Sequence, residues 1–236
     1  MGRNVSTENI HRQHAVKESR ASKPRASSTP PAPPPRYHHG DLRRALIDAA
    51  LAMVIEEGAW DFKLREVARR AGVSHAAPYN HFEDKAALLA EVASLGFHSL
   101  RLAMHAAARS QPRSARQAFV NIGAAYVRFG VEHPAHYRLM FGAELADRER
   151  HPTLHAASDA TFAVLTGVLE RGQLSGQIRR GEVRAQALAA WALVHGLTTL
   201  VIDQRVSFLG VSPRDAERHA RHAAMAMLDG LRPKTS

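Results

Sequence analysis

Residues 68–82, which read ARRAGVSHAAPYNHF, combine hydrogen-bonding side chains and a glycine in a spacing suited to binding DNA. Tyr79 offers a hydroxyl on a rigid ring to a phosphate, and His75 can donate a hydrogen bond to a base or a phosphate. Asn80 can pair with adenine through two hydrogen bonds. Gly72 can adopt the left-handed conformation that a sharp turn after a helix requires. Two short helices joined by this turn predict a helix-turn-helix, whose second helix enters the major groove.

Most of these contacts have alternatives that the sequence leaves open. The ring of Tyr79 could pack in the core, the short Asn80 side chain could touch only the backbone, and His81 could face solvent. Lys85, which follows the segment, could bind a phosphate or carry a solvated charge. The same two interpretations apply to three cations near other helix starts: Arg43, Arg44 and Lys63.

Apolar residues at spacings of three and four indicate the helices that hold this segment in place. The first stripe runs from Leu42 to Val54, with Asp41 as the expected N-cap and Gly58 as the end. A short helix is expected over residues 64–70. Ser74 is expected to cap a third helix that ends near residue 80, with exposed N–H groups that suit phosphate.

The rest of the chain also has helical periodicity. Asp84 is expected to cap a long helix over residues 84–104, which links two domains. Further helices are expected over residues 115–132, 134–141, 154–171, 183–208 and 213–231. Because no segment alternates like a strand between hairpin turns, we predict an all-α fold.

Composition narrows the function classes. The chain has 236 residues and no cysteine, which excludes a disulfide framework, a zinc finger, an iron–sulfur site and a thiol nucleophile. The formal net charge is +10, yet residues 37–96 hold seven basic and nine acidic residues. Phosphate contacts must therefore come from a few well-placed groups rather than from bulk charge. Nothing near the start resembles a signal peptide, so a reduced, cytoplasmic protein is expected.

The first 36 residues are polar, basic and end in a proline cluster. Such a segment buries too little apolar surface to offset the entropy of ordering it, so we expect a disordered arm with a polyproline-like joint. The arm could be a solvated tail, or it could add non-specific affinity for DNA.

The second half offers a candidate pocket for a small-molecule effector. Aromatic and bulky apolar residues there lie on helices that should pack together, with Tyr126 and His195 as the leading polar groups. The alternative for most of them is ordinary core packing. The candidates are Phe119, Ile122, Tyr126, Tyr137, Met140, Phe141, Phe162, Leu165, Trp191 and His195.

Two histidine pairs raise the question of a metal site, since both have spacings that share a helix face. They are His133 with His136, and His151 with His155. No cysteine and no acidic residue completes an obvious third ligand, so we expect no metal and no other cofactor.

The last two predicted helices indicate a homodimer. The helix over residues 183–208 is apolar around most of its circumference, which one core cannot cover. The last helix carries a stripe rich in alanine. Two such helices from each chain would form a four-helix interface.

The pattern from Gly40 to Leu89 resembles the TetR family of bacterial transcriptional regulators. The resemblance rests on LREVARRAGVS at residues 64–74, on Tyr79 with His81-Phe82, and on Asp84-Lys85 with Leu88-Leu89. The later Trp191…His195-Gly196 spacing is similar to the C-terminal class called WHG.

This resemblance implies a DNA-binding domain over residues 37–83, an effector-binding and dimerisation domain over 84–231, and a short tail over 232–236. It also implies a homodimer on a near-palindromic double-stranded DNA operator and a ligand-responsive repressor. Lys85 would contact phosphate. The residues that fall on the recognition helix are Ser74, His75, Ala76, Tyr79, Asn80 and His81.

The chain departs from the family pattern at three positions. Lys63 stands where Thr or Ser is common, although Glu66 could still reach back to the start of the second helix. Pro78 lies inside the recognition helix and lacks an N–H. Asn80 replaces a larger residue, so the operator sequence cannot be transferred.

Two other function classes are weighed against a regulator. An enzyme is disfavoured, because the chain has no glycine-rich phosphate loop, nucleophile elbow or metal-binding His and Glu motif. The other alternative is a ligand-binding or architectural protein whose helix-turn-helix no longer recognises a DNA sequence. Binding to DNA in the presence of specific competitor separates these classes.

Overall fold

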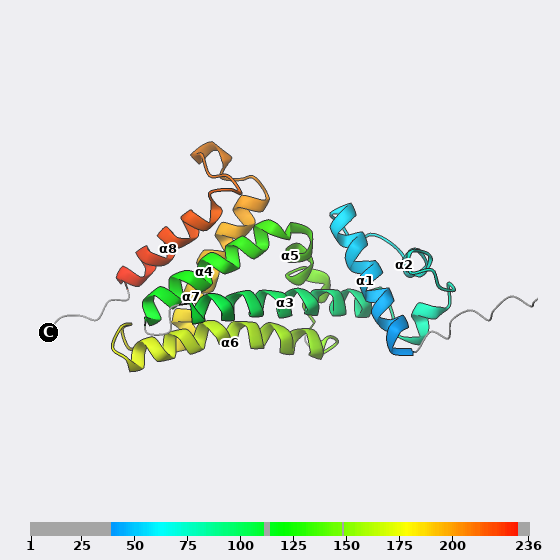
Figure 1. Ribbon diagram of the computed structural model, residues 1–236, viewed down its shortest axis with the longest axis horizontal. Coiled ribbons are helices and arrows are strands. Elements are labelled where there is room, and N and C mark those ends of the chain that lie inside the picture. Colours follow the sequence, from blue (N-terminus) through cyan, green and yellow to red (C-terminus); the bar gives the residue numbers. More distant parts are fainter. Residues whose placement is uncertain (1–38, 111–113, 148, 231–236) are drawn as a thin grey trace, which may run out of the picture. The chain divides into compact units, whose positions relative to one another are not determined.

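The computed structural model describes residues 39–110, 114–147 and 149–230, with residues 39–41 described by their backbone alone. These residues belong to one compact unit, Tyr37–Ser236. They contain eight α-helices, three short 3-10 helices and no strand (Figure 1). The predicted all-α fold is confirmed. The arm expected over residues 1–36 and the tail expected over 232–236 lie outside the described residues.

The helix-turn-helix segment turns where the sequence predicts it. The elements here are α1 (His39–Glu57), α2 (Leu64–Arg70) and the 3-10 helix η1 (Ala77–Asn80). Gly72 has a φ of +70°. Its N–H donates to the Arg69 carbonyl at 3.2 Å, and the Val73 N–H donates to the Ala68 carbonyl at 3.0 Å. These two bonds form a Schellman motif, which ends α2 and sets half-buried Val73 against the core.

The third helix is shorter than expected. An α-helix capped by Ser74 is wrong, because only the four residues of η1 are helical and its N-cap is Ala76. Pro78 has no N–H to donate to the Ser74 carbonyl. Instead, the Ala77 N–H donates to the Ser74 carbonyl at 3.0 Å. Such i→i+3 hydrogen bonds define a 3-10 turn.

The starts of α1 and α2 both differ from the caps expected from the sequence. α1 begins at His39, two residues before the Asp41 expected to cap it. α2 begins after Lys63, whose N–H donates to the Glu66 carboxylate at 2.8 Å. Glu66 therefore makes its own half of a capping box, and its N–H, from which a Thr or Ser side chain at position 63 would accept, donates instead to the Lys63 carbonyl at 2.9 Å.

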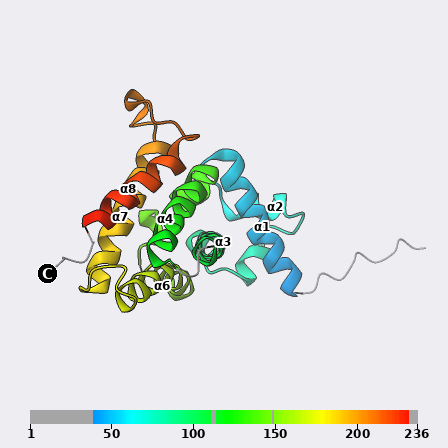
Figure 2. The same cartoon turned by 60° about the vertical axis from the view of Figure 1, so that its left-hand side comes forward.

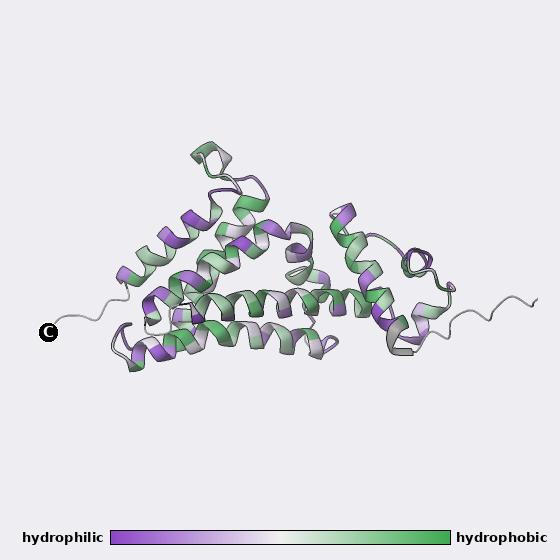
Figure 3. Cartoon of the chain, viewed as in Figure 1, coloured by the Kyte–Doolittle hydropathy of each residue, from purple (hydrophilic) through white to green (hydrophobic). Residues whose placement is uncertain are grey.

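One long helix, α3 (Lys85–Arg109), joins the helix-turn-helix to the rest of the molecule and ends five residues beyond the expected residue 104. Asp84 caps it as predicted, because its carboxylate accepts from the Ala87 N–H at 2.8 Å. α3 packs against α1 near its start and lies between α4 and α6 along its length (Figure 1). Its ribbon is coloured mainly as hydrophobic where these helices enclose it (Figure 3).

Five further α-helices build the second half around α3. α4 packs against α3, α7 and α8, and the last two helices pack against each other (Figure 2). Several ends differ from expectation by one to three residues. The helices are α4 (Ala115–Glu132), α5 (Pro134–Met140), α6 (Pro152–Leu174), α7 (Val183–Ile202) and α8 (Ala216–Gly230).

α7 ends at Ile202, six residues before the expected Phe208. Gln204 adopts a φ of +55°, and its N–H donates to the Val201 carbonyl at 3.1 Å. The Arg205 N–H donates to the Leu200 carbonyl at 2.8 Å. Gln204 thus takes the left-handed position that glycine usually fills in a Schellman motif, which periodicity alone could not reveal.

Two helices, α3 and α7, are long and apolar enough to cross a membrane by length and composition alone. Half of the apolar stretch of α3 is buried inside the protein, against 28% for that of α7. Large apolar side chains remain exposed on α7: Leu188, Leu193 and Leu200. This apolar face of α7 is therefore uncovered in the single chain.

Gly130 of α4 provides a test of the packing between α4, α5 and α7. A Cβ atom there would clash with Thr198 and approach the Tyr137 ring to 3.0 Å. We expect Gly130→Ala to lower the free energy of unfolding by about 1–3 kcal/mol, as overpacking does. Gly167→Ala is the matched control, since its only close neighbour is the flexible end of Arg171. Urea denaturation at one protein concentration measures both; equal stability of the two variants would contradict this packing.

His136 makes stability depend on pH. It is buried on α5, and its Nε2 lies 2.7 Å from the Val92 carbonyl of α3. Burial lowers its pKa, an effect partly offset by that hydrogen bond and reinforced by nearby His133. The unfolded chain therefore takes up a proton as the pH falls through about 6.5, while the folded chain resists it.

Wild-type protein should accordingly lose unfolding free energy between pH 7 and pH 5.5, and His136→Gln should lose less. His105 and His195, whose pKa values are also lowered by burial, contribute to the slope in both proteins. Exposed His98 supplies the control substitution, His98→Gln. Urea titrations across this pH range measure the slopes, and identical slopes for wild type and His136→Gln would refute the assignment.

Candidate functional site

The helix-turn-helix presents one exposed cluster of the predicted DNA-contacting residues. Tyr79 is 62% exposed, whereas Ala77 and Pro78 face the core and anchor η1. His81 is half-buried. The other exposed members of the cluster are Ser74, His75, Ala76 and Asn80. Exposure is what a surface that reads DNA requires, and the Tyr79 ring is not part of the core.

Three of the four cations predicted to contact phosphate already have partners within the chain. Lys85 donates from Nζ to the Trp60 carbonyl at 3.1 Å. Arg44 lies 2.9 Å from Asp48.

Arg43 lies 2.9 Å from Glu91, with its guanidinium 5.4 Å from the centroid of the Phe82 ring. These contacts are partly exposed, and exposed ion pairs are weak enough to be exchanged for phosphate. Lys63 is exposed at the start of α2. Exposed Arg65 and Arg69 of the same helix were not singled out from the sequence; their signal is their place in the first helix of the motif.

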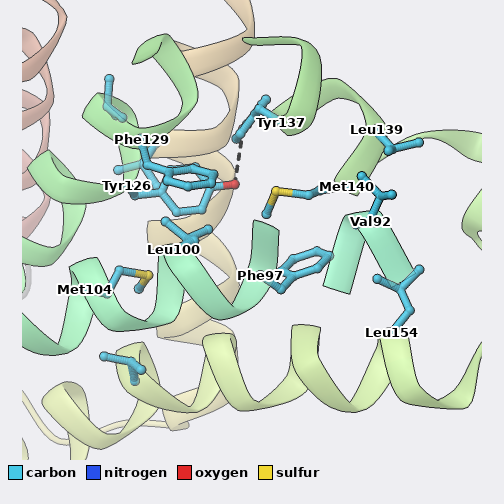
Figure 4. Packing of buried hydrophobic residues seen from close by; sticks show 14 of the residues in the cluster. Val92, Phe97, Leu100, Met104, Tyr126, Phe129, Tyr137, Leu139, Met140 and Leu154 are labelled. Carbon is cyan, nitrogen blue, oxygen red and sulfur yellow. Dashed lines mark hydrogen bonds between the residues drawn. The ribbon is translucent and has the colours of Figure 1, made fainter. Parts of the chain in front are cut away.

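An apolar cavity of about 270 Å³ lies among α3, α4, α6, α7 and α8. Seven of the ten predicted pocket residues line it: Phe119, Ile122, Tyr126, Phe141, Phe162, Leu165 and Trp191. α3 contributes Phe97, Leu100 and Met104 to the same wall. The predicted set omitted these α3 residues, although their helical spacing marks an apolar face. Figure 4 shows them beside Tyr126.

The other three predicted residues line neighbouring cavities. Tyr137 and His195 border a cavity of about 200 Å³, together with Arg138 and Asp203, which form an ion pair at 2.7 Å. Met140 borders a third cavity of about 290 Å³. One half-buried ring, that of Phe141, lines all three.

Four polar side chains form a network in the wall between the first two cavities. Trp191 donates from Nε1 to the Tyr126 hydroxyl at 3.1 Å. That hydroxyl lies 3.1 Å from the Tyr137 hydroxyl (Figure 4). The two hydroxyls lie 2.9 Å and 2.7 Å from Nδ1 of His195.

The protonation states of this network follow from burial. Desolvation raises the pKa of Tyr137 to about 12 and that of Tyr126 well above its ordinary value. Burial lowers the pKa of His195. Neutral His195 can accept at Nδ1, so a chain of donors runs from Trp191 through Tyr126 and Tyr137 to His195. This chain satisfies each buried hydroxyl and fixes the ring positions.

One histidine of each pair considered as metal ligands lies within hydrogen-bonding distance of a backbone carbonyl, whereas the buried Nε2 of His151 has no hydrogen-bond partner among the described residues. His136 Nε2 bonds to the Val92 carbonyl, and His155 Nε2 lies 3.2 Å from the Leu145 carbonyl. Across residues 42–110, 114–147 and 149–230, no three His, Asp or Glu side chains gather as metal ligands would.

Three polar residues of α6 that line the apolar cavity were absent from the predicted set: Ser158, Asp159 and Thr161. Ser158 and Asp159 of α6 line the apolar cavity, one turn before Phe162. Neither carries a sequence signal of its own, because an exposed serine or aspartate on a helix is ordinary.

Comparisons with known proteins match both halves of the chain. The family described as "Bacterial regulatory proteins, tetR family" matches residues 46–92. The family described as "Tetracyclin repressor-like, C-terminal domain" matches residues 119–227. The regulator SrpR of Pseudomonas putida is 39% identical over 62 residues, which are 26% of this chain and 29% of SrpR. The match thus spans less than a third of that relative.

Solved structures extend the similarity over most of the chain. A Rhodococcus sp. RHA1 protein of unknown function is 32% identical, with a TM-score of 0.73, covering 84% of this chain and 99% of that one. The TetR-family regulator PfmR of Thermus thermophilus has the same fold at 23% identity, with a TM-score of 0.59, covering 79% and 97%. The chain is a member of the TetR family of DNA-binding transcriptional regulators.

Proposed function

We propose that this regulator is a ligand-responsive repressor that binds a near-palindromic operator as a homodimer. One observation carries the proposal: a single helix, α3, starts beside the helix-turn-helix and lines the aromatic cavity further along. Members of this family are cytoplasmic regulators and not enzymes, so we expect the protein in the cytoplasm and at the nucleoid when it binds DNA.

The exposed cluster around η1 would read the major groove. Tyr79 is placed to donate its hydroxyl to a phosphate, and Asn80 and His75 to approach base edges. Arg43, Arg44, Lys63 and Lys85 would bind phosphates. Because Arg43, Arg44 and Lys85 already have partners, binding to DNA would exchange those contacts for phosphates and leave no cation unpaired.

The uncovered face of α7, together with α8, would form the dimer interface. Leu188, Leu193 and Leu200 of α7 and Met225 of α8 are between 38% and 57% exposed. Patches of this kind mark interaction sites. Pairing α7 and α8 with the same helices of a second chain would bury them in a four-helix arrangement.

The effector would act through α5 as well as α3. Tyr137 of α5 belongs to the polar network beside the cavity, and the adjacent His136 bonds to the Val92 carbonyl of α3. A ligand that moves Tyr126 or Trp191 would therefore shift α5 against α3. Half-sites lie roughly 34–36 Å apart, so a small tilt of α3 changes whether both recognition elements fit. The ligand must bind one of these two dimer conformations more tightly, or the equilibrium does not shift.

The role of Tyr79 is tested with two substitutions. If its hydroxyl binds a phosphate, Tyr79→Phe and Tyr79→Ala should both weaken binding to DNA by about tenfold, since a hydrogen bond to a charged group is lost. Binding is measured by band shift with DNA from upstream of the protein's own gene and with random DNA, where the loss should be similar.

Ile55→Ala is the control, because Ile55 is 59% exposed on α1, outside the exposed cluster. Wild-type affinity in Tyr79→Phe would remove the hydroxyl from the interface. If wild-type protein shows no preference for any upstream DNA over competitor, the proposed operator binding fails.

The dimer interface is tested by placing charge on the uncovered faces. We expect Leu200→Glu and Met225→Glu each to raise the dimer dissociation constant by about two orders of magnitude, because an unpaired buried charge costs several kcal/mol. Leu102→Glu on α3 is the control, since Leu102 is 53% exposed and lies on neither helix. Sedimentation equilibrium measures all three, and a dimer that survives both substitutions on α7 and α8 uses another surface.

A further inference from the structure

We propose that the cavity between α5 and α7 binds a small aromatic carboxylate, which accepts hydrogen bonds from Nε2 of His195 and from the Arg138 guanidinium. This cavity of about 200 Å³ lies across the polar network from the apolar cavity proposed for the effector. The inference goes beyond the proposed function, because it adds a second ligand site and does not depend on the first.

The first argument is the tautomer of His195. The hydroxyls of Tyr126 and Tyr137 lie 2.9 Å and 2.7 Å from its Nδ1, and the Trp191 N–H already donates to Tyr126. The hydroxyl protons therefore run toward Nδ1, which must accept. A neutral imidazole that accepts at Nδ1 carries its proton on Nε2. Burial lowers the pKa of His195 and so favours this neutral form.

The second argument is the position of that N–H. Both hydrogen bonds of His195 are made at Nδ1, so Nε2 has no partner among the described residues. Nε2 is nevertheless not enclosed, since the one buried side-chain nitrogen or oxygen without a partner in the described part of the chain belongs to His151. His195 borders the cavity between α5 and α7 and not the apolar one. Its Nε2–H is therefore a donor that a ligand in this cavity can reach.

The third argument is the charge of the lining. Among the described residues that line the cavity, Arg138 is the one cation and Asp203 the one anion. Their ion pair at 2.7 Å is weak because it is partly exposed, with side chains 45% and 41% accessible. The guanidinium has five N–H donors, and one of its nitrogens donates to Asp203. It can therefore bind a ligand carboxylate in addition, whereas a ligand cation would have to compete with Arg138 for Asp203.

The fourth argument is the apolar part of the lining, which Phe141 and Ile202 provide. The Phe141 ring lies 5.0 Å from the Tyr137 ring and 4.7 Å from the His195 ring, measured between centroids. A ligand ring can pack beside these rings as a further aromatic pair. The lining thus combines two N–H donors with an aromatic surface, which matches an aromatic ring that carries one carboxylate.

Three probes of one shape isolate the effect of charge: benzoate, benzamide and benzamidinium. Isothermal titration calorimetry of the full-length protein near neutral pH should show benzoate binding about tenfold more tightly than benzamide, because hydrogen bonds to a charged acceptor are stronger. Benzamidinium should bind most weakly, since it offers no acceptor to His195 or Arg138.

Two substitutions at the ion pair test the role of Arg138. Arg138→Gln should remove the advantage of benzoate over benzamide, and Asp203→Asn should raise the affinity for benzoate several-fold by releasing the guanidinium. Arg128 and Glu217 form a second partly exposed ion pair, at 3.5 Å and outside the lining. Arg128→Gln and Glu217→Gln remove the same charges and should leave the preference for benzoate unchanged.

Nuclear magnetic resonance tests His195 directly. Nitrogen-15 spectra of the imidazole rings, with His195→Gln to identify the signals of His195, should show its proton on Nε2 in the free protein. Saturating benzoate should shift this Nε2 resonance, and benzamidinium should not. A proton on Nδ1, or an Nε2 resonance that benzoate leaves unmoved, overturns the inference.

The inference is also overturned if benzamide or benzamidinium binds as tightly as benzoate, if Arg138→Gln keeps the preference, or if none of the three probes gives heat at millimolar concentration. Operator binding, judged by the band shift, is a separate result. Its failure refutes the repressor and leaves the carboxylate site standing, whereas operator binding without a preference for benzoate refutes only the carboxylate site.

Discussion

The rest of the structure depends on the burial of one uninterrupted helix. α3 is 25 residues long. Apolar side chains near its start pack in the core of the three-helix DNA-binding end, and those further along pack in the core around the cavity. Because a helix is stiff along its axis, the packing of α4, α5 and α6 against its second half sets the direction of its first half. Lys85 and Asp84, at the DNA-binding end, are in this way positioned by contacts made three turns away and beyond.

α3 is not alone in connecting the DNA-binding end to the second half of the molecule. The Trp60 indole donates to the Glu144 carboxylate at 3.4 Å, and Arg150 forms an ion pair with Asp84. Both pairs join the DNA-binding end to the segment between α5 and α6. Partly exposed contacts of this kind contribute little stability, so the tilt proposed for α3 would lose little free energy by breaking them.

The spacing of apolar residues along the sequence was sufficient to predict where the α-helices lie, but it was not sufficient to predict where several of them end. The turn at Gly72, the cap at Asp84 and the bounds of α2 and α4 follow from local residues, and local rules predict them. The early end of α7 depends on Gln204 in a left-handed conformation, and the shortened recognition helix on Pro78. The division of ten pocket candidates among three cavities depends on how five helices meet.

The Phe141 ring borders all three cavities, so its orientation bears on the range of ligand sizes that the proposed effector site could hold. The ring lies 5.3 Å from Phe97, 5.0 Å from Tyr137 and 4.7 Å from His195, measured between centroids. A rotation about its side-chain bonds would exchange one set of aromatic neighbours for another and join compartments that are now separate. If the apolar cavity binds the proposed effector, the length of ligand that it accepts would then depend on the orientation of this one ring.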